Sequence, residues 1–529
     1  MNLSRLFGGL LMLISLVGCQ READAPAPAD PKAQATAQED TAIDWFKGDV
    51  NEAFARARAE NKPVLLLWSA EWCPPCHKLK AGIFKRPDFI AKTRLFVPVY
   101  LDGDEEGGQK AAEEFHVAGY PTVVILSPER EELARISGGM DLNRYAEVLD
   151  LALGDARPVK TILASLQNDA SELSADDCRR LAYNEWLADD QITDDLDHAA
   201  DALALAASRC PTSSRIERAR LQAVSTYAAV AAAENSGTPT PAQNARLKKD
   251  VSAIAQILAE PTVARGAADY LAYLGTDFFA AAKRVDAQAK SLRDPWIALM
   301  EAVSVDPNRA TADQLMATVS KLRAIKSFAA DDKLPADAVQ LALQKADAAL
   351  ADTPDEHSRS AVVNSVLWIY DAIGDKDRAY ALLEHEVATS RYPYYYLADL
   401  ASLEEERGNK DKALELLKRA YEESKGSATR FQWGTDYVFG LLRMRPQDDA
   451  TIRYASLAVL GELDGPDRIY SRSRVRLDRL NTRLLAWNEK NAHAQTIAVL
   501  RTRMNEICAH VPADQPASAT CAQFLLAKS

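Results

Sequence analysis

The 529-residue sequence has few of the side chains that usually hold metal ions or cofactors. It contains seven histidines and seven cysteines, and no second cysteine or histidine pair stands at the spacing of a zinc site. No glycine-rich phosphate-binding loop is present either. Five of the histidines are scattered through the last two thirds of the chain: His198, His357, His385, His493 and His510. We therefore expect neither a metal nor a cofactor.

The sequence also lacks an excess of basic residues. Its formal net charge is −13, which argues against nucleic-acid binding, because that needs a basic surface. One basic stretch, Arg468 to Arg483, alternates with leucine and tyrosine, and we predict it to be the solvated face of a helix. An acidic protein of this kind suits protein partners.

A single compact apolar run, Leu6 to Val17, opens the chain and is too short to span a bilayer. The basic stretch before it and Gly18 after it are typical of an export signal. Leu16-Val17-Gly18-Cys19 resembles the bacterial lipobox, which implies a signal peptide over 1–18 and lipidation of Cys19. The alternative is an ordinary signal with an incidental cysteine. In the lipobox reading, Gln20 would direct the protein to the outer membrane, and we expect a lipid-anchored, periplasm-facing protein of the bacterial envelope.

Residues 19–41 have almost no large apolar side chains and contain several prolines. Such a composition cannot build a core. We predict a disordered tether that holds the folded part away from the membrane.

Two cysteines separated by two residues, Cys73 and Cys76, follow the apolar run Val64 to Trp68. That run has the length of a buried strand, and helical spacing of apolar residues resumes after the cysteines. Cys73 is thereby predicted at a helix N-terminus, where backbone N–H groups and the helix dipole stabilise a thiolate. We predict Cys73 to be a nucleophile and Cys76 to be the resolving thiol.

The segments Trp72-Cys73-Pro74-Pro75-Cys76 and Val117-Ala118-Gly119-Tyr120-Pro121-Thr122 resemble the thioredoxin superfamily. The resemblance implies an α/β thioredoxin fold over 42–154, with a central mixed sheet flanked by helices. It implies that Pro121 is cis, and that Trp72, Tyr120 and Pro121 contact the substrate. The runs Val123 to Leu126 and Leu133 to Ile136 are predicted to form the closing hairpin.

One departure from the family pattern bears on mechanism, and so does the pair of prolines between the cysteines. Leu67 replaces the buried aspartate that many relatives use for proton transfer, so another group or water must serve. Glu71 and His77 are the nearest titratable groups, but such side chains are more often solvated, and we assign neither a catalytic role. Pro74 and Pro75 offer no N–H to the Cys73 sulfur, which favours a reductase or isomerase over a strong oxidant.

The same segment also matches the C-x-x-C-H signature for attachment of c-type haem, through Cys73, Cys76 and His77. Haem needs an apolar crevice and usually a second axial ligand. The flanking strand and Tyr-Pro loop already account for a redox turn, so we favour the dithiol reading.

Four further cysteines suit an oxidising compartment. Cys178 and Cys210 lie in neighbouring helical segments, and Cys508 and Cys521 bracket a proline-containing loop. Both pairs are plausible structural disulfides in an exported protein. Other pairings, or buried free thiols, remain open at this point.

The sequence after the thioredoxin-like segment is predicted to be helical throughout, because apolar residues recur at three- and four-residue spacing. Residues 155–350 are expected to form an α-helical array. Gly374-Asp375-Lys376-Asp377-Arg378-Ala379 recurs 34 residues later as Gly408-Asn409-Lys410-Asp411-Lys412-Ala413. This period resembles tetratricopeptide repeats, which we place at 351–445, with a C-terminal helical segment at 446–529.

Helical repeats of this kind usually bind peptides or proteins on a concave surface. The stripe Tyr392-Pro393-Tyr394-Tyr395-Tyr396 is a candidate for such a surface, although aromatic residues here more often fill the seam between helix pairs.

Two functions are therefore expected. The favoured one is an envelope thiol–disulfide oxidoreductase that acts on protein thiols and disulfides, is reset by a redox partner and recruits proteins through its repeats. The alternative is an assembly or scaffold protein in which the repeats bind partners and the thioredoxin module is secondary.

Overall fold

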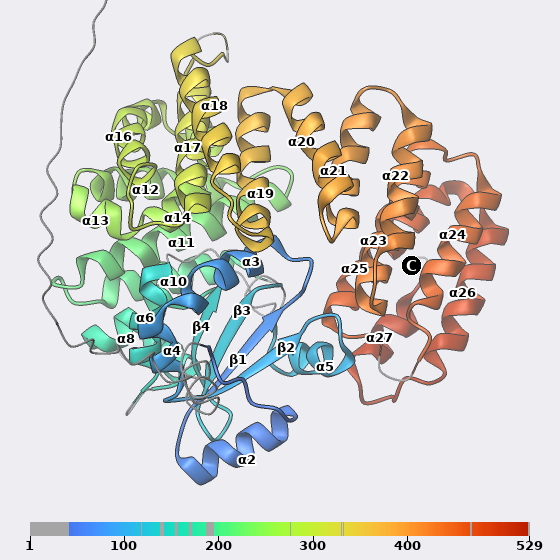
Figure 1. The fold of residues 1–529 in the computed structure, drawn as a ribbon, viewed down its shortest axis with the longest axis horizontal. Helices are drawn as coiled ribbons and strands as arrows, with labels where there is room; N and C mark the ends of the chain where they lie inside the picture. Colours follow the sequence, from blue (N-terminus) through green and yellow to red (C-terminus); the bar gives the residue numbers. More distant parts are fainter. Residues whose placement is uncertain are drawn as a thin grey trace, which may run out of the picture. The chain divides into compact units, whose positions relative to one another are not determined.

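A four-stranded mixed sheet forms the N-terminal part of the computed structural model (Figure 1). Its strands are β1 (Val64–Ser69), β2 (Val97–Asp102), β3 (Thr122–Leu126) and β4 (Glu132–Ser137), in the order β2-β1-β3-β4. β1 runs parallel to β2 and antiparallel to β3, and β3 pairs antiparallel with β4. The predicted mixed sheet and its closing hairpin are confirmed.

The structure describes residues 42–526, except for 118, 138–141, 154–156, 169–171, 187–194, 276, 330, 332 and 466–467. The predicted signal, the lipidation candidate Cys19 and the tether lie outside the described residues. Among the helices that are described, none combines the length and the apolar character needed to cross a bilayer.

Helices cover both faces of the sheet. They are α2 (Val50–Glu60), α3 (Pro74–Ala81), the short 3₁₀ helix η1 (Ile83–Lys85), α4 (Pro87–Thr93), α5 (Glu106–Glu114) and α6 (Leu142–Leu151). Every residue of β1 is buried, as expected for a central strand packed on both faces. Leu66 and Trp68 contribute to one core with Phe54 and Phe115. Pro98 can lie in β2 because that strand is at one edge of the sheet.

The second face of the sheet shares its core with the first helices of the C-terminal region. Leu65 and Leu67 belong to the same buried cluster as Ile162, Leu181 and Leu203. These last three residues come from α7 (Val159–Asn168), α8 (Ala175–Tyr183) and α10 (Leu196–Arg209). A disulfide joins Cys178 to Cys210 within this buried cluster. The helical region therefore begins as part of the sheet's own core.

The remaining chain is a large all-helical region, as the sequence predicted (Figure 1). A disulfide joins Cys508 to Cys521 near its end. Its elements are α11 (Arg215–Asn235), α12 (Pro241–Leu258), α13 (Pro261–Gly266), α14 (Ala268–Leu274), α15 (Phe278–Val285), η2 (Ala287–Leu292), α16 (Arg293–Val303), α17 (Thr311–Ser327), α18 (Ala336–Ala351), α19 (Glu356–Ile373), α20 (Lys376–Thr389), α21 (Pro393–Glu406), α22 (Lys410–Glu423), α23 (Ser427–Met444), α24 (Asp449–Gly461), α25 (Ser471–Trp487), η3 (Glu489–Asn491), α26 (Ala494–Cys508) and α27 (Pro516–Gln523).

The two sequence repeats adopt the same turn between paired helices. Gly374 joins α19 to α20 with φ +80°, and Gly408 joins α21 to α22 with φ +84°. The following residues close the turns identically: the Asp375 N–H donates to Tyr370 O, and the Asn409 N–H donates to Glu404 O, each at 2.9 Å. Glycine suits both positions because a Cβ disfavours positive φ.

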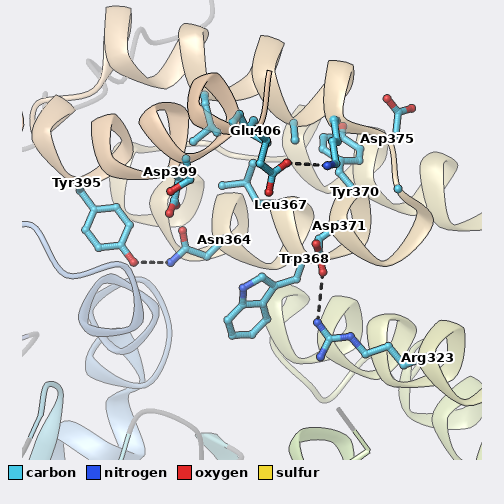
Figure 2. Close-up of a pocket in the computed structure, with 16 residues that line it drawn as sticks. Arg323, Asn364, Leu367, Trp368, Tyr370, Asp371, Asp375, Tyr395, Asp399 and Glu406 are labelled. Atoms are coloured by element: carbon cyan, nitrogen blue, oxygen red, sulfur yellow. Dashed lines mark hydrogen bonds and ion pairs between the residues drawn. The ribbon is translucent and has the colours of Figure 1, made fainter. Parts of the chain in front are cut away.

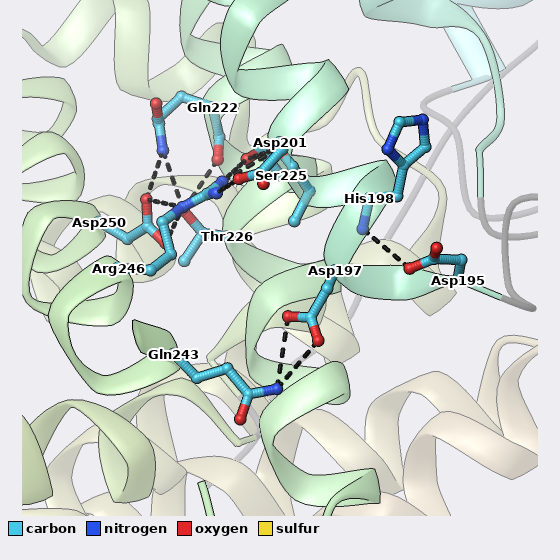
Figure 3. Close-up of polar contacts among 11 residues, drawn as sticks. Asp195, Asp197, His198, Asp201, Gln222, Ser225, Thr226, Gln243, Arg246 and Asp250 are labelled. Atoms are coloured by element: carbon cyan, nitrogen blue, oxygen red, sulfur yellow. Dashed lines mark hydrogen bonds and ion pairs between the residues drawn. The ribbon is translucent and has the colours of Figure 1, made fainter. Parts of the chain in front are cut away.

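Buried polar contacts tie α10, α11 and α12 together (Figure 3). Arg246 on α12 forms an ion pair with Asp250 at 3.1 Å and donates to Ser225 Oγ at 2.6 Å and Ala200 O at 3.0 Å. Gln222, which lies on α11, donates a hydrogen bond to the Asp250 carboxylate of α12 at 3.0 Å. Because each donor meets an acceptor inside the helix packing, we read this network as structural.

Replacing Arg246 with alanine should destabilise the protein by about 3 kcal/mol, because Asp250 would remain buried without its cation. Urea unfolding of the two proteins measures this difference. Exposed Arg501 provides the matched control, since Arg501→Ala should change stability by less than about 0.5 kcal/mol. Equal losses in the two variants would contradict a structural role for the network.

Candidate active site

Cys73 and Cys76 lie at the start of α3 and are joined by a disulfide. Cys73 is the N-cap residue, and its sulfur accepts a hydrogen bond from the Cys76 N–H at 3.3 Å. Pro74 and Pro75 occupy the first turn, where a missing N–H removes no helical hydrogen bond. Both cysteines are buried, with Cys73 only 3% exposed.

The Tyr120–Pro121 peptide bond is cis, and Tyr120 packs against the two cysteines. The Tyr120 hydroxyl donates to Gly103 O at 3.0 Å and accepts from Gln109 Nε2 at 2.8 Å. Gly103 has no room for a side chain, because an added Cβ would lie 2.2 Å from the Tyr120 ring. These contacts fix Tyr120 beside the dithiol.

Trp72 links the dithiol to the helical region. Its indole Nε1 donates to Asp104 Oδ2 at 2.7 Å, and its ring stacks on Tyr395 of α21 with the centroids 6.0 Å apart. The guanidinium of Arg472, from α25, lies 5.3 Å from the Trp72 ring centroid and 5.0 Å from that of Tyr120. Two residues distant in sequence thus cover both aromatic neighbours of the cysteines.

Asp104 is the polar centre of this contact. Besides Trp72, it accepts from the Thr429 hydroxyl of α23 and lies 3.7 Å from Arg472 Nη1. Burial raises the pKa of Asp104, although its three polar contacts act in the opposite direction. An ion pair of 2.6 Å between Arg474 and Glu113 joins α25 to α5 nearby.

The outer face of α3 packs against α19 (Figure 1), and an ion pair joins α3 to α17. Lys78 forms an ion pair of 2.5 Å with Asp313, and both side chains are largely buried. The His77 and His357 rings lie 4.7 Å apart. Helices from the C-terminal region therefore contact α3, Trp72 and α5, which flank the dithiol.

His77 corrects one sequence-based expectation, since it is buried rather than solvated. Its Nε2 donates to the Glu71 carbonyl oxygen at 2.7 Å, and its Nδ1 is buried without a hydrogen-bond partner among the described residues. Burial lowers the pKa of His77 to about 4. The ring is therefore neutral at physiological pH. Glu71 stays exposed, as expected.

The basic stretch near the C-terminus also differs from expectation. Arg472 and Arg474 lie on the side of α25 that contacts the thioredoxin-like part, so this face is partly buried rather than solvated. The tyrosine stripe divides: Tyr394 and Tyr396 are buried among helices, whereas Tyr395 contacts Trp72 and Tyr392 donates to Glu71 Oε2 at 3.2 Å.

The sequence alone did not predict that Asp104, Tyr395, Thr429 and Arg472 lie beside the dithiol. The Tyr-rich stripe and the basic stretch were the only signals, and neither pattern names a partner. Leu67, which replaces the family aspartate, is 1% exposed in the sheet core. Within the described residues, no group of three or more histidine, cysteine or carboxylate side chains could hold a metal ion.

Comparisons with known proteins match the thioredoxin-like segment. A family model described as a thioredoxin-like domain matches residues 50–153. The chain is 32% identical over 109 residues to Thioredoxin H-type of Brassica oleracea. That match covers 21% of this chain and 80% of the relative. A solution structure of a thioredoxin from Thermus thermophilus matches with 26% identity and a TM-score of 0.19, over 21% of this chain and 85% of that one.

The chain is also 28% identical over 101 residues to Thiol:disulfide interchange protein DsbD 2 of Pseudomonas aeruginosa. That match covers 18% of this chain and 17% of the relative. The chain thus spans less than a fifth of the interchange protein's length.

The low pKa of His77 predicts an acid-dependent loss of stability. Between about pH 6.5 and 4, His77 is protonated in the unfolded chain but stays neutral in the folded chain. The free energy of unfolding therefore falls as the pH falls. His77 should account for about 3 kcal/mol of that loss. Urea unfolding at pH 7 and pH 4 should show a shallower decline for His77→Gln. The exposed-site control His385→Gln should follow the wild type, and a wild-type decline in His77→Gln would contradict the prediction.

Proposed function

Because this chain belongs to the thioredoxin family, we propose that it is a thiol–disulfide oxidoreductase acting on polypeptides. The observation that carries the proposal is the Cys73–Cys76 disulfide at the start of α3, beside the cis Tyr120–Pro121 bond. Cys73 is the nucleophile and Cys76 the resolving thiol. Trp72, Tyr120 and Pro121 contact the substrate.

The exchange proceeds in two balanced steps. The Cys73 thiolate attacks one sulfur of a substrate disulfide, the substrate S–S bond breaks, and the second substrate sulfur leaves as a thiolate and takes a proton. The Cys76 thiolate then attacks the Cys73 sulfur and releases the first substrate sulfur. Two electrons pass from the dithiol to the substrate, and a dithiol partner protein restores the reduced form.

The local hydrogen bonding favours a reductase or isomerase. The sulfur of Cys73 accepts from the Cys76 N–H, whereas Pro74 and Pro75 carry no N–H to add a second bond. A thiolate with few donors is less stabilised, and strong oxidants depend on a stabilised reduced form.

The burial of Cys73 defines the shape of substrate that fits. With Tyr395 and Arg472 against Trp72, a flat protein surface does not reach a sulfur whose residue is 3% exposed. An extended or unfolded segment is narrow enough to approach once these side chains move. The helical region, with its tetratricopeptide-like pairs α19–α20 and α21–α22, recruits such partners.

We place the protein in the bacterial envelope, anchored through a lipid on Cys19 and facing the periplasm. The lipobox-like sequence supports this location. The disulfides Cys178–Cys210 and Cys508–Cys521 also support it, because disulfides persist in oxidising compartments.

One observation favours the alternative function of an assembly or scaffold protein. Both cysteines are buried, and helices of the C-terminal region contact Trp72 and α3 beside them, as they would if the thioredoxin-like part served mainly as a docking platform for the helices. In that case the double variant Cys73→Ser, Cys76→Ser would keep near-normal function in the cell.

The oxidoreductase proposal predicts that Cys76→Ser protein accumulates mixed disulfides with polypeptides, because the resolving attack is missing. Mass spectrometry after alkylation and non-reducing separation identifies the trapped chains. Adding Cys73→Ser should abolish the adducts, and reduction of an unfolded disulfide substrate by that double variant should fall to the uncatalysed rate. Absence of Cys73-dependent adducts from folded, exported protein would favour the scaffold function.

A further inference from the structure

A pocket of about 520 Å³ lies between α19, α20 and α21 (Figure 2). None of its lining residues has a role in the exchange described above, although one of them, Tyr395, contacts Trp72. One wall comes from α21, where Tyr395, Asp399 and Glu406 follow each other at helical spacing. The other comes from α19, with Asn364 and Trp368 one turn apart. The pocket is therefore a groove between two helices.

The length of the groove suits a short extended peptide. From Tyr395 to Glu406 the α21 wall rises about 16 Å, at the usual 1.5 Å per residue. An extended chain covers that distance with about five residues. The exposed ring of Trp368, 42% accessible, provides an apolar surface beside such a chain.

The charges in the groove leave one carboxylate without a counterion. Both basic residues of the lining are already engaged, because Arg323 pairs with Asp371 at 3.5 Å and Lys376 pairs with Glu406 at 2.6 Å. Figure 2 shows the Arg323–Asp371 pair apart from the carboxylate of Asp399.

Asp399 carries that free carboxylate. Within the described part of the chain, no hydrogen bond or ion pair involves its side chain, which is exposed in the groove lining. The fourth carboxylate of the lining, Asp375, is different, because it caps α20 through the Arg378 N–H and pairs with the Arg378 guanidinium at 3.3 Å. A cation that entered the groove would meet Asp399 as its available partner.

The groove also adjoins the dithiol. Tyr395 forms its end wall: the hydroxyl accepts from Asn364 Nδ2 at 2.8 Å, while the ring stacks on Trp72, the residue before Cys73. A chain lying along α21 toward Tyr395 is thereby led toward the attacking sulfur.

We propose that this groove binds an extended, positively charged segment of the substrate polypeptide, with a lysine or arginine side chain paired to Asp399. The segment adjoins the cysteine that Cys73 attacks. The inference rests on the proposed function for the identity of the bound chain as a substrate, but the binding itself does not require exchange.

The test uses the full chain in its Cys73→Ser, Cys76→Ser form, so that binding is measured without redox chemistry. The probes are fluorescent, N-acetylated and C-amidated hexapeptides that carry a single lysine, norleucine or glutamate, scanned through each position. Fluorescence anisotropy should show that a lysine peptide binds about tenfold more tightly than its norleucine counterpart, and that the glutamate peptide binds most weakly. Acetylation ensures that the side chain provides the only ammonium group.

Asp399→Asn should remove the preference for lysine, and Asp399→Lys should reverse it in favour of glutamate. Asp377→Asn is the matched control, because this α20 carboxylate is 96% exposed and lies outside the groove lining, and it should keep the tenfold preference. Absence of a lysine preference at every position, or its persistence in Asp399→Asn, would overturn the inference.

The redox assay of the intact dithiol separates the two proposals. If wild-type protein reduces disulfides through Cys73 while binding ignores peptide charge, the groove assignment fails and the proposed function stands. If lysine peptides bind through Asp399 but no Cys73-dependent exchange occurs, the groove binds a basic segment and the oxidoreductase proposal fails.

Discussion

The contact of Trp72 with Tyr395 and Arg472 is the constraint on which the arrangement of the site depends. Trp72 precedes Cys73, so the side chains that cover its ring also determine what can approach the sulfur. Asp104 fixes the Trp72 indole by accepting a hydrogen bond from its N–H. The same carboxylate accepts a hydrogen bond from the Thr429 hydroxyl of α23. Residues from helices far apart in the sequence thus contact Trp72 and Asp104 beside the candidate active site.

Shared packing joins the thioredoxin-like part to the helical region. The sheet face that carries Leu65 and Leu67 is buried by α7, α8 and α10, so the helical region is an extension of the sheet's core. Burying apolar area of this kind contributes about 25 cal/mol per Å², far more than surface ion pairs. The buried Lys78–Asp313 pair then fixes how α3 meets α17. Side chains of α21 and α25 then cover Trp72, the residue before Cys73.

Local features were predictable from the sequence, whereas contacts between distant segments were not. The run Val64 to Trp68 is apolar at every position and forms the central strand β1. Gly374 and Gly408 repeat because each turn needs positive φ. Amphipathic spacing indicates that a helix has a buried face but does not name its partner, which is why Arg472 was expected in solvent. His77 was misplaced for the same reason, since residues of α19 and the Tyr392 ring enclose it.

The central claim is that Tyr395 and Arg472, by covering Trp72, restrict access to Cys73 in the native protein, and the alkylation rate of reduced Cys73 tests it most directly. Iodoacetamide and a maleimide with a long polyethylene glycol chain would be compared in folded and urea-unfolded protein by peptide mapping. The account predicts strong protection of Cys73 from the bulky reagent in the folded chain, and loss of that protection in Tyr395→Ala, Arg472→Ala protein. Equal protection from both reagents in wild type and variant, or no protection from either, would contradict it.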